Sequence, residues 1–300
     1  MSILNRTTGY KFKPGRFILT ALVAAGLTWF GILVAASELF TETILHPPCQ
    51  ADATAPQGFE PIILTTHDGY SLRGWWKEPE NGGVILLMGG IGANRSAMLQ
   101  EAVWLGESGF GAVLLENRNC QGGSATLGYR ESQDFLTMMD FARQQAQVNW
   151  FGAMGFSAGG VAATRAAAVS PDIQALVSEG SFANLVELIA PKESKFLSPE
   201  WQLQQMILLV LWRRLEFWPG TISPIDDLTK NNSRPVLLIF GEKEINRSQA
   251  EEMLQASGSN GSLWIAASAN HGEYSKYDEV SYKTVLLNFF LNAQKNSHTP

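Results

Sequence analysis

Six short, continuously apolar runs separated by longer mixed stretches constrain the fold of this 300-residue chain more than any other feature. Strands that are apolar on both faces suit a parallel sheet covered by helices, and their alternation with helix-length stretches indicates repeated strand–helix units. Two further strand-like runs, residues 59–66 and 70–77, flank an Asp-Gly turn and predict an antiparallel hairpin. We therefore predict an α/β fold with a mostly parallel, doubly wound sheet, whose central strands lie at residues 84–88, 112–115, 150–154, 173–177, 236–240 and 263–267.

A longer interval interrupts this alternation between Phe182 and Pro235. Within it, residues 201–215 carry apolar side chains at helical spacing, and two later prolines would end a helix. We predict an inserted helical cap at approximately residues 182–234, built on a stripe of Leu203, Met206, Ile207, Val210 and Leu211. Because residues 207–212 are all apolar, a second membrane-contacting helix is the alternative for this stretch.

The amino-terminal region contains an uncharged apolar segment, residues 17–37. About 20 helical residues cover the hydrocarbon thickness of a bilayer. Four basic residues and no acid precede the segment, which under the positive-inside rule places the N-terminus in the cytoplasm. We predict a cytoplasmic basic segment (1–16, with Arg6, Lys11, Lys13 and Arg16), a transmembrane helix (17–37), a linker (38–58) and one extracytoplasmic domain (59–295).

Cleavage of the same segment as a secretory signal is the main alternative. Val34-Ala35-Ala36 before Ser37 resembles a small-residue cleavage site, and cleavage would give a secreted or periplasmic protein. The apolar segment is, however, longer than the about 7–15 residues usual in a signal peptide. A helix buried in a soluble core is a third interpretation.

Charge and cysteine content exclude several functional classes. A net charge of −6 provides no basic surface for a phosphate backbone, so no nucleic acid partner is expected. Cys49 and Cys120 make neither a disulfide framework nor a set of metal ligands, and no metal or cofactor is expected. A packing or surface role is the favoured interpretation of both cysteines, and one long-range disulfide is the alternative.

The motif with most chemical content is Gly155-Phe156-Ser157-Ala158-Gly159-Gly160. It follows the predicted strand at 150–154 and opens a helical stretch at 161–169, which is the context of a nucleophile elbow. The glycines permit a tight turn that would project Ser157 at the carboxyl edge of the sheet. A Gly-rich turn with an incidental serine is the alternative.

A serine nucleophile needs a histidine base, and the chain has four histidines. In the order that usually accompanies this elbow the histidine comes last, which removes His46 and His67. His298 lies three residues from the chain end, where fraying is expected. His271 remains, just past the last predicted strand, on the edge that should carry Ser157.

The acid that orients this histidine should follow a strand between Ser157 and His271. Glu244 is our choice, because it closely follows the strand at 236–240. Glu242 and Glu179 are alternatives at strand ends. Asp226 and Asp227 lie in a Pro-containing loop, where we expect them to cap the return of the inserted segment.

Two backbone N–H groups should stabilise the oxyanion of the tetrahedral intermediate. One is that of Ala158, directly after the nucleophile, and the other is that of Gly90, with Ile91 second, in the Gly-rich loop after the strand at 84–88. A plain tight turn is the alternative for this loop. A phosphate-binding loop is disfavoured because no Lys-Ser/Thr pair follows it.

Several further motifs accompany the serine motif. They are His46-Pro47-Pro48, Thr66-His67-Asp68-Gly69, Leu72-Arg73-Gly74-Trp75, Gly122-Gly123-Ser124 with Gly128 and Glu131, Ser223-Pro224-Ile225-Asp226 and Asn270-His271-Gly272. With these motifs, the chain resembles the α/β-hydrolase superfamily across residues 59 to about 293, and within it bacterial membrane-anchored hydrolases related to eukaryotic alpha/beta-hydrolase-domain proteins, some of which are depalmitoylases. It departs from many relatives in having Met88-Gly89 in place of His-Gly, and Glu244 in place of Asp.

This resemblance implies a serine hydrolase that cleaves a carboxylic ester or thioester through an acyl-enzyme, without a cofactor. The apolar cap and the membrane segment favour a lipid-like acyl substrate. Two alternatives stay open: an amide hydrolase resembling serine aminopeptidases, and a non-catalytic membrane-anchored binding protein of the same fold. Fold alone does not choose between them, since one fold serves many chemistries.

Overall fold

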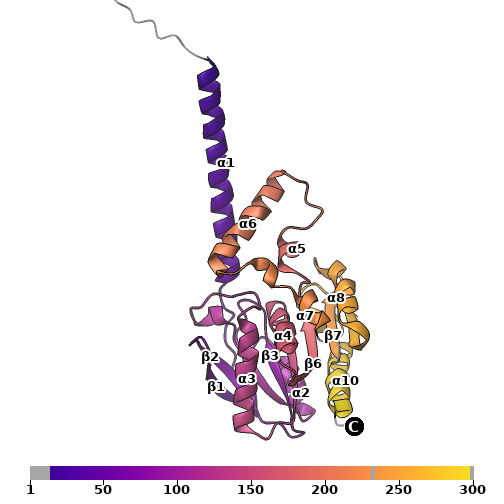
Figure 1. Ribbon diagram of the computed structural model, residues 1–300. Helices are drawn as coiled ribbons and strands as arrows, with labels where there is room; N and C mark the ends of the chain where they lie inside the picture. Colours follow the sequence, from indigo (N-terminus) through magenta and orange to yellow (C-terminus); the bar gives the residue numbers. More distant parts are fainter. Residues whose placement is uncertain (1–13, 231–233, 298–300) are drawn as a thin grey trace, which may run out of the picture.

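The computed structural model describes residues 14–230 and 234–297, so the basic residues before Pro14 and His298 lie outside the described part of the chain. A single eight-stranded sheet forms the centre of the domain (Figure 1). Its strands are β1 (Glu60–Thr65), β2 (Ser71–Lys77), β3 (Gly83–Met88), β4 (Gly111–Leu115), β5 (Trp150–Phe156), β6 (Ile173–Glu179), β7 (Val236–Gly241) and β8 (Gly261–Ala266).

The strand order is β1-β2-β4-β3-β5-β6-β7-β8. β1 pairs antiparallel with β2 and β2 antiparallel with β4, whereas every later pair is parallel. The predicted hairpin and the six predicted apolar strands are therefore confirmed, as is the predicted α/β fold class. The carboxyl ends of β5, β7 and β8 meet at one edge, which brings the loops after them together.

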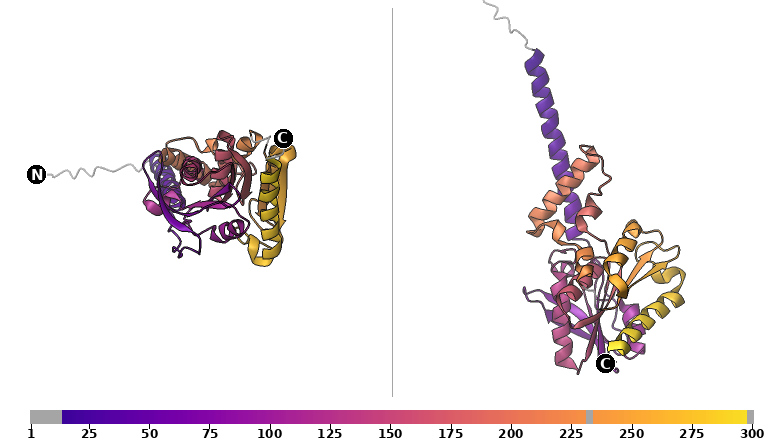
Figure 2. Two further views of the ribbon diagram at one scale, coloured as in Figure 1. Left: turned by 90° about the horizontal axis from the view of Figure 1, so that it is seen from below. Right: turned by 45° about the vertical axis from the view of Figure 1, so that its right-hand side comes forward.

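Helices cover both faces of the sheet (Figure 2). Alternate residues of the central strands explain this, because Leu86 packs with one buried cluster and its neighbour Leu87 with the other. The helices of the domain are α2 (Leu99–Glu107), α3 (Glu131–Gln145), α4 (Ala158–Val169), α5 (Leu185–Ile189), α6 (Pro199–Leu215), α7 (Pro224–Thr229), α8 (Ala250–Ala256), α9 (Tyr274–Tyr277) and α10 (Glu279–Ser297). Short 3-10 turns lie at Arg118–Gln121, Pro219–Thr221, Arg247–Gln249 and Gly258–Asn260.

The amino-terminal helix α1 (Pro14–Leu45) projects from the domain as one rod (Figure 1). Residues 15–45 are long and apolar enough to cross a membrane, and only 6% of the most apolar window is buried. The helix continues to Leu45, eight residues past the expected end at Ser37, because its last turns pack on the domain: Ser37, Thr41 and Leu45 are almost fully buried. The cap insertion contains α5, α6 and α7, and α6 lies beside α1 (Figure 2).

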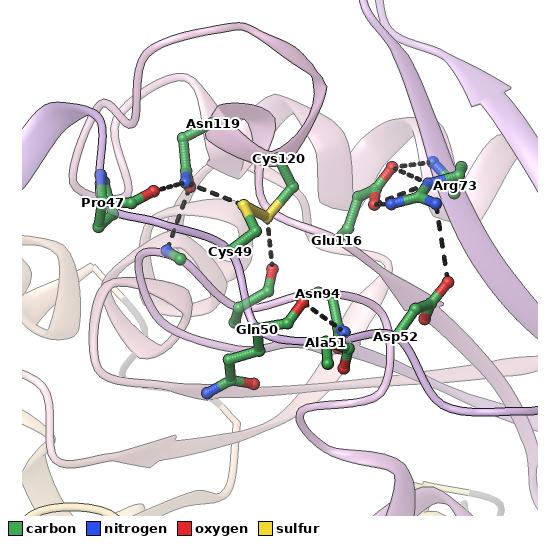
Figure 3. The surroundings of a disulfide bond; sticks show 12 residues. Pro47, Cys49, Gln50, Ala51, Asp52, Arg73, Asn94, Glu116, Asn119 and Cys120 are labelled. Carbon is green, nitrogen blue, oxygen red and sulfur yellow. Dashed lines mark hydrogen bonds and ion pairs between the residues drawn. A yellow bond between two sulfur atoms is a disulfide. The ribbon is translucent and has the colours of Figure 1, made fainter.

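The segment after α1 is fastened to the domain (Figure 3). The interpretation of Cys49 and Cys120 as packing or surface residues is wrong, because they form a disulfide across 71 positions. The pairing follows from the path of the chain: the Gln50 N–H donates to the Gly92 carbonyl (3.0 Å) and the Asn119 amide donates to the Pro47 carbonyl (3.0 Å), which leaves the two cysteine Cα atoms 5.5 Å apart. The expected linker is thus held against the loop after β3 over these residues.

Candidate active site

Ser157 lies at the sharp turn between β5 and α4, with φ 55° and ψ −122°. A positive φ is costly for serine and is typical of a residue whose position is fixed by its surroundings. The neighbouring glycines are required sterically: a Cβ at Gly155 would lie 2.1 Å from the Gly159 carbonyl oxygen, and one at Gly159 would lie 2.1 Å from the Met88 carbonyl oxygen. The Ser157 N–H donates to the Glu179 carbonyl (2.7 Å), which holds the turn on β6.

His271 lies in the loop after β8 and faces Glu244 from the loop after β7. Nδ1 of His271 is 3.1 Å from Oε2 of Glu244. The other carboxylate oxygen of Glu244 accepts the Gly241 N–H (2.7 Å), so the carboxylate is fixed in direction. The Glu244 side chain is fully buried, whereas that of His271 is 47% exposed. This arrangement leaves Nε2 of His271 available for a reacting group.

The other acid candidates have different partners. Glu242 accepts the Ser268 N–H (2.8 Å) at the surface. Glu179 lies 2.7 Å from the Tyr282 hydroxyl oxygen, which belongs to α10. Asp226 is exposed in the first turn of α7, and Asp227 pairs with Lys230 (2.9 Å) and Arg165 (3.6 Å), so both lie at the helix that closes the cap. Glu244 is the one of these candidates that the structure brings to His271.

Two histidines that precede the serine lie elsewhere. Nε2 of His46 is 2.7 Å from the Ser124 hydroxyl and its Nδ1 is 3.2 Å from Glu42, at the base of α1. His67 is exposed in the turn between β1 and β2. Neither is placed with Glu244.

The two predicted oxyanion donors lie on either side of the serine. Ala158 is the first residue of α4, where backbone N–H groups have no partner within the helix. Gly90 faces Ser157 closely, since a Cβ built on it would lie 3.0 Å from the Ser157 Cβ and 3.5 Å from its hydroxyl oxygen. The absence of a side chain at Gly90 therefore lets the backbone approach the nucleophile.

Two aromatic residues and one glycine surround the histidine, and the sequence reasoning missed them. The Phe156 ring lies 4.6 Å from the His271 ring, centroid to centroid. A Cβ at Gly180 would lie 2.2 Å from the Tyr274 hydroxyl and 2.8 Å from Cε1 of His271, so only glycine fits there. Burial raises the pKa of Tyr274, and the nearby Glu244 carboxylate raises it further. Phe156 stands next to the serine in sequence, and Tyr274 three residues after the histidine, which are signals that could have found both.

An apolar cavity of about 420 Å³ opens onto the serine. Its walls come from the cap, from the loops after β3 and η1 (Arg118–Gln121), and from the end of α1. The lining residues are Phe40, Ile44, Ile91, Leu127, Ser157, Ala158, Phe182, Leu185, Leu188, Ile189, Glu200, Leu203, Gln204 and Ile207.

A smaller cavity of about 200 Å³ shares Ile91 with the apolar cavity and is lined by Glu101, Glu179 and Tyr282. The Tyr282 hydroxyl oxygen is 2.7 Å from Glu179 and 3.0 Å from Glu101. A phenol has one proton to donate, so a second hydrogen bond requires a proton on one of the carboxyl groups. Accordingly, burial and the charge of Glu101 raise the pKa of Glu179 well above its usual value.

Within the described residues no group of three or more His, Cys, Asp or Glu side chains could hold a metal ion. The chemistry available at the carboxyl edge is that of a serine, a histidine and a buried carboxylate. This combination on a mostly parallel sheet defines an α/β-hydrolase.

Solved structures with the same fold agree with this class. Esterase Pf2001 from Pyrococcus furiosus has a TM-score of 0.66 at 20% identity, covering 83% of this chain and 97% of that one. Est1E from Butyrivibrio proteoclasticus has a TM-score of 0.60 at 18% identity, covering 78% and 99%. The alpha/beta hydrolase GrgF from Penicillium sp. sh18 has a TM-score of 0.61 at 16% identity, covering 80% and 99%.

The sequence itself assigns a family. Residues 111–297 match the model of the prolyl oligopeptidase family, so the chain belongs to that family and is a hydrolase. No curated protein matches the sequence significantly.

Proposed function

We propose that the protein is a membrane-anchored serine hydrolase that cleaves a carboxylic ester or thioester. One observation carries the proposal: the strained Ser157 stands at the carboxyl edge where His271 is oriented by the buried Glu244, 3.1 Å from its Nδ1. Nε2 of His271 would take the proton of Ser157 as its oxygen attacks the acyl carbon, and Glu244 would stabilise the imidazolium. The N–H groups of Gly90 and Ala158 would bind the oxyanion.

The same histidine would then complete the reaction. It would give its proton to the departing alcohol or thiol, leaving the acyl group on Ser157. A water molecule deprotonated by His271 would attack this acyl-enzyme and release the carboxylic acid. The apolar cavity beside Ser157 supports a lipid-like acyl group as the substrate part that is held there.

Amide hydrolysis is the second candidate, and membership in the prolyl oligopeptidase family favours it. A panel of p-nitrophenyl esters of increasing chain length, compared with p-nitroanilide amides of amino acids and peptides, separates the two. We expect turnover of the esters to exceed that of the amides and to disappear in Ser157→Ala. Turnover of amides alone would replace the esterase proposal, and binding without any turnover would favour a non-catalytic protein.

We further propose that α1 is retained as an anchor and that the domain lies outside the cytoplasm. The disulfide between Cys49 and Cys120 supports this location, because such bonds persist in oxidising compartments. The basic residues before the helix support the same orientation. A reporter that is active only outside the cytoplasm, fused after Pro300, should be active; activity of a cytoplasmic reporter there would reverse the topology.

A further inference from the structure

The helix that is long enough to span a membrane also forms part of the apolar cavity. Phe40 and Ile44, both in the last turns of α1, line this cavity together with Ser157. Leu45 is 1% exposed and packs in the buried cluster of the cap. The Ala125 N–H donates to the Leu45 carbonyl (2.9 Å), which joins the end of the helix to the domain. The end of α1 therefore forms one wall of the apolar cavity.

The cap helix α6 lies beside α1 and runs in the same direction (Figures 1 and 2). At its beginning, Gln202 accepts a hydrogen bond from the Trp29 indole (2.8 Å). At its end, Arg213 and Arg214 pair with Glu38, and Arg214 also pairs with Glu42. Trp29 lies nine residues before Glu38, so the start of α6 lies about 13 Å farther along α1 toward the membrane segment.

The outer surface of this helix pair carries several exposed apolar side chains beside the Arg213–Glu38 ion pair. Leu39 of α1 is 71% exposed, and Leu209 and Trp212 of α6 are each 51% exposed. The loop before α6 adds Phe196 and Leu197, which are also exposed. Tryptophan is typical of membrane interfaces, and apolar surface of this extent beside a membrane helix fits lipid better than water. These side chains therefore fit contact with the lipids of the outer leaflet.

The cavity is partly open where α1 forms its wall. Phe40 of α1 and Leu188 of α5 both line the cavity and are 42% and 39% exposed, so they form part of its rim. An acyl chain that lies along α1 in the bilayer would meet this rim first. Passing from lipid into an apolar cavity keeps the chain out of water throughout.

We propose that the substrate is a long-chain acyl ester of an outer-leaflet lipid, which enters the cavity sideways from the bilayer between α1 and the cap. This inference rests on the proposed esterase function. Ser157 would attack the ester carbonyl carbon, the glycerol-type alcohol would leave with the proton from His271, and water would release the fatty acid. The net reaction converts an ester and water into an acid and an alcohol.

The test uses the full chain in phosphatidylcholine nanodiscs with two probes. Soluble p-nitrophenyl butyrate reports the catalytic site, and 1-palmitoylglycerol embedded in the bilayer reports lateral entry by the release of palmitate. Leu209→Lys places a charge on the lipid-facing side of α6, outside the cavity. We expect it to reduce palmitate release by about tenfold or more and to leave butyrate turnover unchanged. Val280→Lys is the matched control, because Val280 is 77% exposed on α10, and should change neither rate.

A second measurement does not depend on catalysis. A photoactivatable phosphatidylcholine should crosslink to peptides from α6 and not to peptides from α10. Butyrate turnover without palmitate release, equal loss of both rates in Leu209→Lys, or absence of crosslinks to α6 would overturn lateral entry and leave the esterase standing. Release from a soluble S-palmitoylated peptide but not from the lipid would overturn the lipid as substrate. Loss of all ester turnover in the unmodified protein would instead refute the proposed function and, with it, this inference.

Discussion

Two cavities share Ile91 in their walls, and they differ in the chemistry of their other lining residues. The larger is apolar, reaches Ser157 and is lined in part by the end of α1. The smaller contains two carboxyl groups and two tyrosines, and the disulfide-held segment contributes Gln50 to its wall. The comparison shows that the two sides of this sheet edge offer different chemistry. The apolar side fits an acyl group, whereas on the acidic side burial raises the pKa of the carboxyl groups.

Exchange of Glu244, the proposed triad acid, should give the largest loss of activity. Glu244→Gln keeps the shape but removes the charge that orients His271, so turnover should fall by up to about 10⁴ with little change in Tm; this magnitude is that of the trypsin-like example from which the rule is taken. Glu244→Asp should retain more activity than the amide. Ester turnover of purified variants measures this, with Glu242→Gln and Glu179→Gln as controls that should lose little. If Glu242→Gln or Glu179→Gln lost its ester turnover while Glu244→Gln kept normal turnover, the residue exchanged in the inactive variant would be the acid.

Removal of the disulfide should give the second largest effect, a loss of stability. The bond closes a loop of 71 residues, so Cys49→Ser with Cys120→Ser should lower the free energy of unfolding by about 4 kcal/mol in the chain-entropy account. Denaturant unfolding of the protein in detergent measures the loss. The bond lies on the side of the acidic cavity, so butyrate turnover at low temperature should persist. An unchanged stability would mean that hydrogen bonds alone hold the segment after α1.

Narrowing the apolar cavity should give a smaller and selective effect. Leu203→Trp places a larger ring among the cavity walls and should lower kcat/KM for long-chain esters by about 10-fold to 100-fold. Short-chain esters should be affected little, because they need less of the cavity. Kinetics across the p-nitrophenyl ester series checks this. An equal loss for every chain length would mean that the cavity does not hold the acyl group.

A substitution in the acidic cavity should give the smallest effect, which should appear as a pH dependence of Tm. Burial raises the pKa of Glu179 above its usual 4.5, so its contribution to stability is fully present below that value and is lost as the pH rises toward the raised pKa. Glu179→Gln should therefore raise Tm relative to wild type at pH 8 and change it little at pH 4. Melting curves across this range test the sign, with exposed Glu242→Gln as control. A uniform fall in Tm at all pH values would show that the carboxyl is needed for packing alone.

The placement of Ser157, His271 and Glu244 at one edge of the sheet could be predicted from the sequence because its signals are local. The elbow glycines must stand next to Ser157, and His271 and Glu244 must closely follow strands that are recognisable by their own apolar runs. The pairing of Cys49 with Cys120 could not be predicted from local sequence, because it depends on how two loops 71 residues apart meet in the fold. The same holds for the contact of α6 with α1, which extends the helix to Leu45 and makes Phe40 and Ile44 part of the cavity.

Labelling by a fluorophosphonate tests the central claim most directly. The reagent reacts with a serine that an adjacent base activates, so the full chain should be labelled on Ser157, as located by mass spectrometry of the peptide that contains residues 155–160. Ser157→Ala should abolish both the labelling and the hydrolysis of activated esters while Tm stays close to that of the wild type. Labelling at full stoichiometry in Ser157→Ala would place the nucleophile elsewhere and contradict the account.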